Sequence, residues 1–203
     1  MEAQTSALRR GLSWRSERLC GRRAMAAYSE LELKYAWPIA NAMILRPDFR
    51  KWILSGTKHE HEFSEALPID EFEAKRLRSP TIKNPYWFNY WCPKDKRCEC
   101  RIGSGIETDI LIILENSNER RLGIHVEVKR PGDKLGNGQA ASYSRRAACW
   151  AVPSTRPRTV PVYQEFLTTL VCGAELAGAT LQGFDKVLFH HDVAKRVEVY
   201  PEP

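Results

Sequence analysis

The sequence predicts an α/β fold in which helices flank a mixed central sheet within a single domain. Residues 109–115 are almost continuously apolar, a pattern typical of a strand that is covered on both faces. Residues 122–129 form a second strand pattern after a turn at 116–119, and helical patterns lie before and after this pair. A chain of 203 residues with this order of elements fits one α/β domain.

The first elements are predicted to be helices. Ser29 and Glu32 form a capping box, with Ser29 at the N-cap and Glu32 at the third helical position. Pro38 is expected to kink this helix or to divide it in two, because proline lacks a backbone N–H. A second helix is expected up to Gly56, and a short third helix over residues 69–77.

The second half of the chain supplies the remaining strands and one long helix. Residues 86–92 are aromatic and favour β structure. A loop rich in glycine follows residue 129, and a helix is predicted from Gln139 to about Trp150. Residues 166–172 and 186–190 are predicted to be two further strands.

The basic charge is concentrated at the N-terminus. Residues 1–25 contain six arginines and two glutamates, and so contribute +4 of the formal net charge of +6. This stretch is expected to be a disordered basic extension that precedes a domain at 26–203, although a transit-like or DNA-contacting arm is an alternative. The domain is nearly neutral, so a nucleic-acid site would have to be a local patch.

Six cysteines without a secretory signal favour reduced thiols in a cytoplasmic protein. Cys92, Cys98 and Cys100 have the spacing C-x5-C-x-C, which differs from the C-x2-C of structural zinc sites. A hairpin with its turn at residues 93–96 is the simpler interpretation, and a zinc or iron–sulfur site is the alternative. No apolar run is long enough to span a bilayer, so a membrane protein is not expected.

Three charged residues are predicted to meet at one edge of the sheet. Glu127 and Lys129 share a face of the second strand, because side chains on a strand alternate. If the two strands pair as a hairpin, Asp109 lies near both. Two carboxylates there would repel each other, and Mg²⁺ is a cation that suits carboxylate oxygens and waters.

This pattern resembles the PD-(D/E)xK nuclease superfamily, which has the restriction-endonuclease-like fold. The core motif reads Thr108-Asp109 and Glu127-Val128-Lys129, with threonine where the family often has proline. Gln139 and Tyr143 look like the Q-x3-Y element of the RecB-like branch. The resemblance covers roughly residues 28–195, but only residues 107–143 carry motifs.

The resemblance implies a metal-dependent nuclease that hydrolyses phosphodiester bonds in DNA. Asp109 and Glu127 would bind Mg²⁺ (or Mn²⁺), Lys129 would assist the attacking water, and Gln139 would support the site from its helix. Many family members place another acid on the first helix, where Glu32 is the first candidate and Glu30 the second. The alternative for Glu32 is its capping role. For Asp109, Glu127 and Lys129 the alternative is a surface salt-bridge cluster at a sheet edge.

Contacts with nucleic acid are expected near the loop and the helix that follow Lys129. The candidates are Arg130, Lys134, Tyr143, Arg145 and Arg146, which together would track a phosphate backbone. A catalytically inactive nucleic-acid- or partner-binding module of the same fold is the competing hypothesis. A homodimer or a partner subunit is also plausible, because many nucleases of this fold cut both strands as dimers.

Other residues are expected to be structural. His125 is expected to be a packed or hydrogen-bonded strand residue, and residues 190–192 are interpreted as the end of the last strand. The aromatic side chains of residues 86–91 are expected to pack in the core, with stacking on unpaired bases as the alternative.

Overall fold

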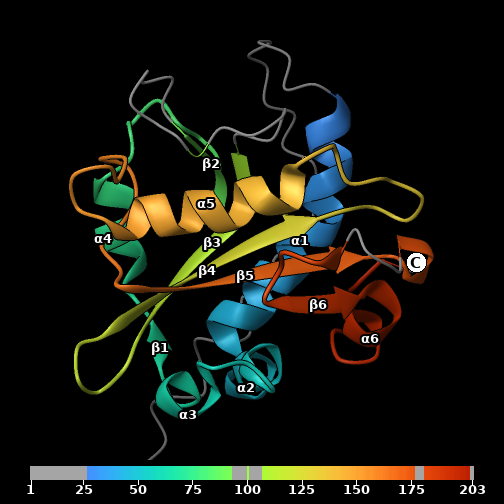
Figure 1. Ribbon diagram of the computed structural model, residues 1–203, viewed down its shortest axis with the longest axis horizontal. Coiled ribbons are helices and arrows are strands. Elements are labelled where there is room, and N and C mark those ends of the chain that lie inside the picture. Colours follow the sequence, from blue (N-terminus) through green and yellow to red (C-terminus); the bar gives the residue numbers. More distant parts are fainter. Residues whose placement is uncertain (1–26, 93–99, 101–106, 177–180, 202–203) are drawn as a thin grey trace, which may run out of the picture.

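Six strands form one mixed sheet in the part of the chain that the computed structural model describes, residues 27–92, 100, 107–176 and 181–201 (Figure 1). The predicted extension at 1–25, Cys98 and the predicted turn at 93–96 lie outside these residues. The strands are β1 (Leu67–Pro68), β2 (Phe88–Trp91), β3 (Glu107–Glu115), β4 (Arg121–Val128), β5 (Glu165–Cys172) and β6 (Lys186–Phe189).

The two predicted strands of the motif, β3 and β4, are neighbours inside the sheet. The order is β1, β3, β4, β5 and β6, and β2 pairs with β3 as well. β3 is antiparallel to β1, β2 and β4, whereas β4, β5 and β6 run parallel. Ile110 lies opposite Val126, which brings Asp109 next to Glu127 at the end of the ladder.

Helices cover both faces of the sheet, as the buried strand pattern predicts. α1 lies behind the sheet in Figure 1, and α5 crosses its front. α5 contacts β4 and β5. The helices are α1 (Ala27–Leu45), α2 (Pro47–Leu54), α3 (Glu60–Phe63), α4 (Glu71–Arg76), α5 (Gln139–Ala151) and α6 (His190–Ala194), and a 3₁₀ turn spans Ala174–Leu176.

Each face of the sheet has its own apolar layer. Ile39 and Met43 of α1 pack in one layer with Ile112 of β3. Leu111, the preceding residue of β3, lies in the other layer with Trp150 of α5. Alternate residues of β3 thus enter opposite cores, and this is why the strand is apolar almost throughout.

The start of α1 corrects one prediction, and its continuity excludes one of the two alternatives for Pro38. The helix begins at Ala27, so Ser29 lies inside it rather than at the N-cap, and Glu32 is not at the third position of a capping box. Pro38 does not divide the helix, which continues to Leu45. The missing hydrogen bond is tolerated because Ile39 and its neighbours are completely buried against the sheet.

The prediction that residues 190–192 end the last strand is also wrong. β6 ends at Phe189, which has an extended backbone and is the N-cap residue of α6. The helix itself begins at His190. The ring of His190 is held in the interior by two hydrogen bonds, to a backbone carbonyl and to a tyrosine hydroxyl. The chain therefore leaves the sheet at this residue. The strands predicted over 109–115, 122–129 and 166–172 are confirmed.

Within the described ranges, no helix combines the length and the apolar character that crossing a bilayer requires.

Gly123 on β4 is a position where a larger residue should destabilise the fold. A Cβ atom there would lie 2.9 Å from the ring of Tyr163. The ring cannot easily move away, because its hydroxyl forms hydrogen bonds with His125 and with the carbonyl of Ala147. We expect Gly123→Ala to lower the free energy of unfolding by about 1–3 kcal/mol in urea denaturation, as overpacking typically does.

A double-mutant cycle with Tyr163→Leu checks the cause of this loss. If the ring is the obstacle, Gly123→Ala should cost less in the leucine background than in the native chain. An equal cost in both backgrounds would contradict the steric explanation.

Candidate active site

The structure brings Asp109 and Glu127 together at the edge of the sheet. Asp109 lies near the start of β3, and its Oδ2 accepts a hydrogen bond of 2.8 Å from the backbone N–H of Val128 on β4. The two side chains are only 6% and 2% exposed, respectively. Buried carboxylates are costly unless charge or hydrogen bonds compensate them, so their immediate partners matter.

The two oxygens of Glu127 have different surroundings. Oε1 accepts from Lys129 Nζ at 2.7 Å and from Gln139 Nε2 at 2.6 Å. Oε2 is buried and has no hydrogen-bond partner among the described residues. One oxygen of the most buried acid of the site thus lacks, within the described part of the chain, the hydrogen bond that burial calls for.

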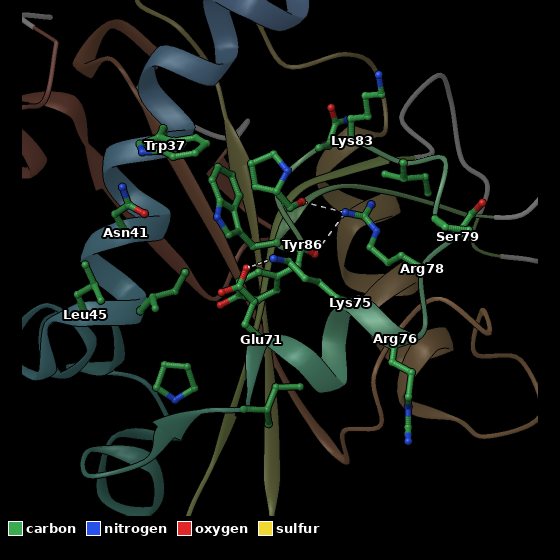
Figure 2. Close-up of a pocket in the computed structure, with 18 residues that line it drawn as sticks. Trp37, Asn41, Leu45, Glu71, Lys75, Arg76, Arg78, Ser79, Lys83 and Tyr86 are labelled. Carbon is green, nitrogen blue, oxygen red and sulfur yellow. Dashed lines mark hydrogen bonds and ion pairs between the residues drawn. The ribbon is translucent and has the colours of Figure 1, made fainter. Parts of the chain in front are cut away.

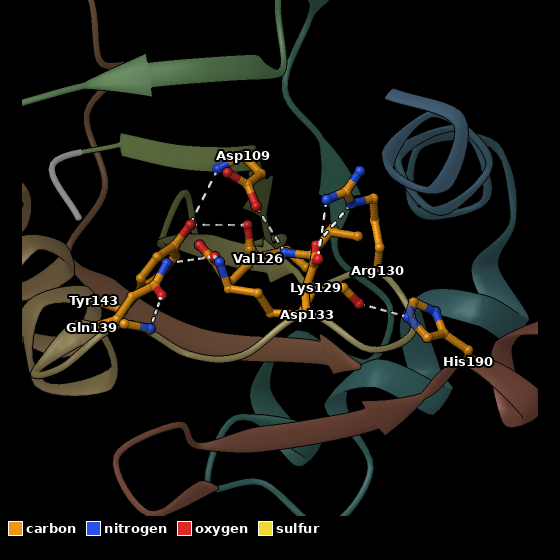
Figure 3. Close-up of polar contacts among 11 residues, drawn as sticks. Asp109, Val126, Lys129, Arg130, Asp133, Gln139, Tyr143 and His190 are labelled. Atoms are coloured by element: carbon orange, nitrogen blue, oxygen red, sulfur yellow. Dashed lines mark hydrogen bonds and ion pairs between the residues drawn. The ribbon is translucent and has the colours of Figure 1, made fainter. Parts of the chain in front are cut away.

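Helix α5 supplies further contacts to the site through Gln139 and Tyr143 (Figure 3). Gln139, its first residue, receives a hydrogen bond of 2.8 Å from the N–H of Gly136, which orients its amide toward Glu127. One turn later, the hydroxyl of Tyr143 accepts a bond of 3.2 Å from the N–H of Asp109. The spacing of four residues places Gln139 and Tyr143 on the same face of the helix.

Further carboxyl groups increase the negative charge of the site. Burial, and then the charge of Glu127, raise the pKa of Asp109 well above its usual value. Burial, followed by the charges of Glu32 and Glu127, raises the pKa of Glu107 to about 7. The charge of Glu32 on α1 thus acts on both residues of β3, and its role as the acid of the first helix stays a prediction.

Comparison of the chain with protein-family models, with curated proteins and with solved structures gives no match. The site is therefore interpreted from its own chemistry.

Glu107 is a member of the site that sequence reasoning did not select. It lies two residues before Asp109 on the same strand, a spacing that places both side chains on one side. That alternation is present in the sequence and was sufficient to find it.

The candidate nucleic-acid contacts divide into buried and exposed residues. Tyr143 and Arg146 are completely buried, so neither side chain reaches a phosphate backbone, and this revises their expected role. Arg146 Nε instead donates to Thr108 Oγ1 at 3.0 Å. Lys134 and Arg145 are exposed, as a phosphate contact requires.

Arg130, the remaining candidate contact, forms a two-pronged ion pair with Asp133 within the same loop. Its Nε and Nη2 donate to the two carboxylate oxygens at 2.7 and 3.0 Å. The guanidinium group thus helps to fix the loop that follows Lys129.

The residues expected to be structural are mostly packed. His125 is buried, and its Nε2 lies 2.8 Å from the hydroxyl of Tyr163, as predicted. The aromatic residues of β2 and the preceding turn are largely in the core, but Trp91 is 52% exposed. Cys92 and Cys100 are both buried, with their sulfur atoms 3.2 Å apart.

A separate cavity of about 1180 Å³ lies between α1, α4 and residues 78–87 (Figure 2). None of the described residues that line it is a predicted site residue. Its half-buried ionisable groups are poor acids or bases near neutral pH, because burial raises the pKa of Tyr86 to about 12 and a guanidinium such as that of Arg78 does not lose its proton in proteins. The carboxyl cluster is therefore the better candidate for catalysis.

The raised pKa of Glu107 predicts a pH-dependent stability. Its folded-state pKa of about 7 exceeds the usual 4.5, so its contribution is complete below pH 4.5 and is lost as the pH rises through 7. We expect Glu107→Gln to reduce the drop in melting temperature between pH 5 and pH 8, measured with EDTA present.

Glu198→Gln is the matched control, because Glu198 is an exposed glutamate. It should show the same drop as the native chain. An unchanged drop in Glu107→Gln would show that Glu107 does not bind its proton more tightly in the folded state.

Proposed function

We propose that the protein is a metal-dependent nuclease of the PD-(D/E)xK type that hydrolyses phosphodiester bonds in DNA. The observation that carries the proposal is the environment of Glu127, a buried carboxylate with Lys129 on one oxygen and no partner on the other. Asp109 lies beside it, in the order and on the strands that the motif requires. A salt-bridge cluster at a sheet edge would not need a buried oxygen without a partner.

The residues fit a divalent cation with an open coordination sphere. Within the described ranges, no three His, Cys, Asp or Glu side chains converge into a ready-made metal site. Mg²⁺ is usually bound through one or two carboxylates, with waters and substrate phosphates as the other ligands. Asp109 and Glu127 would hold it, and the unpartnered Oε2 of Glu127 is the first donor.

When bound, Mg²⁺ would stabilise negative charge on the scissile phosphate. The residues of the chain supply the rest of the chemistry. The ammonium group of Lys129 is held by Glu127, where it can orient the attacking water and offset the charge of the pentavalent phosphate. Gln139 keeps Glu127 in place from α5, and Tyr143 supports the backbone of Asp109.

The proposed function goes together with a restriction-endonuclease-like fold in a single domain. The mixed sheet with helices on both faces is compatible with a restriction-endonuclease-like fold in a single domain. A cytoplasmic location and a homodimer or partner subunit stay predictions from the sequence.

Cleavage of supercoiled, linear and single-stranded DNA with Mg²⁺ or Mn²⁺ tests the proposal. We expect Glu127→Gln and Lys129→Ala to lower the rate by roughly 10²-fold or more, because each removes charge at the reacting phosphate. EDTA should abolish cleavage. Glu198→Gln, which changes an exposed acid, should retain the native rate.

Absence of metal-dependent cleavage by the native chain on all three substrates would overturn the nuclease proposal. DNA binding that persists unchanged in both variants would then favour the non-catalytic binding module.

Lys134 and Arg145 are expected to contact the DNA backbone, since both are exposed on the loop and the helix that follow Lys129. Replacing both with alanine should weaken binding at low salt. It should also reduce the slope of log K against log salt by roughly 2, about 0.9 for each phosphate contact that is lost. Fluorescence anisotropy over a range of salt concentrations measures this slope.

Arg158→Ala is the control, an exposed arginine beyond the far end of α5. It should leave the slope unchanged. An equal effect of the control and the double variant would indicate a general charge effect rather than a local contact.

A further inference from the structure

The backbone of Lys129 is held by a histidine from a distant part of the chain. β4 ends at Val128, and the N–H of Lys129 donates to the carbonyl of Val171 at 2.8 Å. The carbonyl of Lys129 is bonded to Nε2 of His190 at 2.7 Å (Figure 3). Both backbone groups are therefore fixed at the point where the strand passes into a loop.

His190 is itself held firmly. It is 1% exposed, and its Nδ1 lies 2.6 Å from the hydroxyl of Tyr200. A carbonyl can only accept a hydrogen bond, so Nε2 must carry the proton toward Lys129, and in the neutral ring Nδ1 accepts from Tyr200. Burial lowers the pKa of His190, which keeps the ring neutral at pH 7.

The same ring also contacts the helix that carries Glu32. Tyr35 of α1 packs against His190 with ring centroids 5.0 Å apart. Tyr35 follows Glu32 by three residues, so the two side chains lie on one face of the helix. His190 thus connects the helix of one candidate site residue with the strand end of another.

We propose that His190 is a positioning residue, which fixes the backbone of Lys129 and thereby holds its ammonium group at Glu127. The inference rests on the proposed nuclease function. Lys129 is followed by Arg130 and Pro131, and proline cannot donate a backbone hydrogen bond that would continue the ladder. Without His190, rotation of the Lys129 carbonyl would move the side chain, and a misplacement of about 1 Å at a reacting group can cost on the order of 10²-fold in rate.

Kinetics of two substitutions test this role. His190→Leu removes the donor, and it is made together with Tyr200→Phe so that no buried hydroxyl loses its partner. We expect kcat to fall roughly 10- to 100-fold with KM changed less than about threefold. His190→Gln, whose amide can donate to the Lys129 carbonyl, should recover most of the rate.

Ile53→Ala serves as the control for lost stability, because Ile53 is buried on α2, a helix that carries none of the site residues. At a temperature where all variants are folded, it should keep the native kcat. Full activity of the His190→Leu, Tyr200→Phe protein would overturn the inference and leave the nuclease proposal intact. A native chain that cleaves no DNA would overturn both.

The ring tautomer gives a test that does not depend on activity or on the folding of a variant. Nitrogen NMR of the native protein should show His190 with its proton on Nε2. A proton on Nδ1 would exclude the hydrogen bond to Lys129 and overturn the inference.

Discussion

Glu127 is buried in the sheet, and its negative charge needs partners there. These partners come from the end of β4 and from the start of α5, so the position of both elements is linked to Glu127. Its Oε1 is bonded to Lys129 from the same strand and to Gln139 from the start of α5. To bring Gln139 there, the chain must reverse after β4, and it does so through a loop with left-handed backbone at Gly132 and Gly138. One buried carboxylate thus defines both the end of the strand and the beginning of the helix.

A second polar network holds α5 against the sheet farther from the site. Tyr163 donates its hydroxyl proton to the carbonyl of Ala147, so it accepts from Nε2 of His125, and Nδ1 of His125 is left to accept from Thr108. Thr108 in turn accepts from Arg146. Burial lowers the pKa of His125, consistent with a neutral ring in this chain. The network connects β3, β4 and α5, the three elements that carry Asp109, Glu127 and Gln139.

Local sequence patterns predicted β3, β4 and α5 because their apolar residues recur with the period of each element. Motif spacing brought Asp109 and Glu127 together correctly, since antiparallel pairing fixes which residues become neighbours. Burial of Arg146 and the turn at His190 could not be predicted in this way. Their partners come from segments far along the chain, and a charged or polar residue looks like a surface residue until those partners are known.

The charge balance distinguishes the site from an ordinary charged sheet edge. Four carboxyl groups influence one another there, those of Glu32, Glu107, Asp109 and Glu127, and the cationic groups acting on Glu107 are Lys129 and Arg146. An edge that only prevents aggregation would keep such charges exposed and paired, at little cost. Here Asp109 and Glu127 are buried, Glu32 and Glu107 are partly buried, and the four acids outnumber the bases. Protons compensate the excess charge, as the raised pKa values of Asp109 and Glu107 indicate. A divalent cation would supply the same compensation without a proton, and for this reason the proposed nuclease function assigns the excess of acids to Mg²⁺.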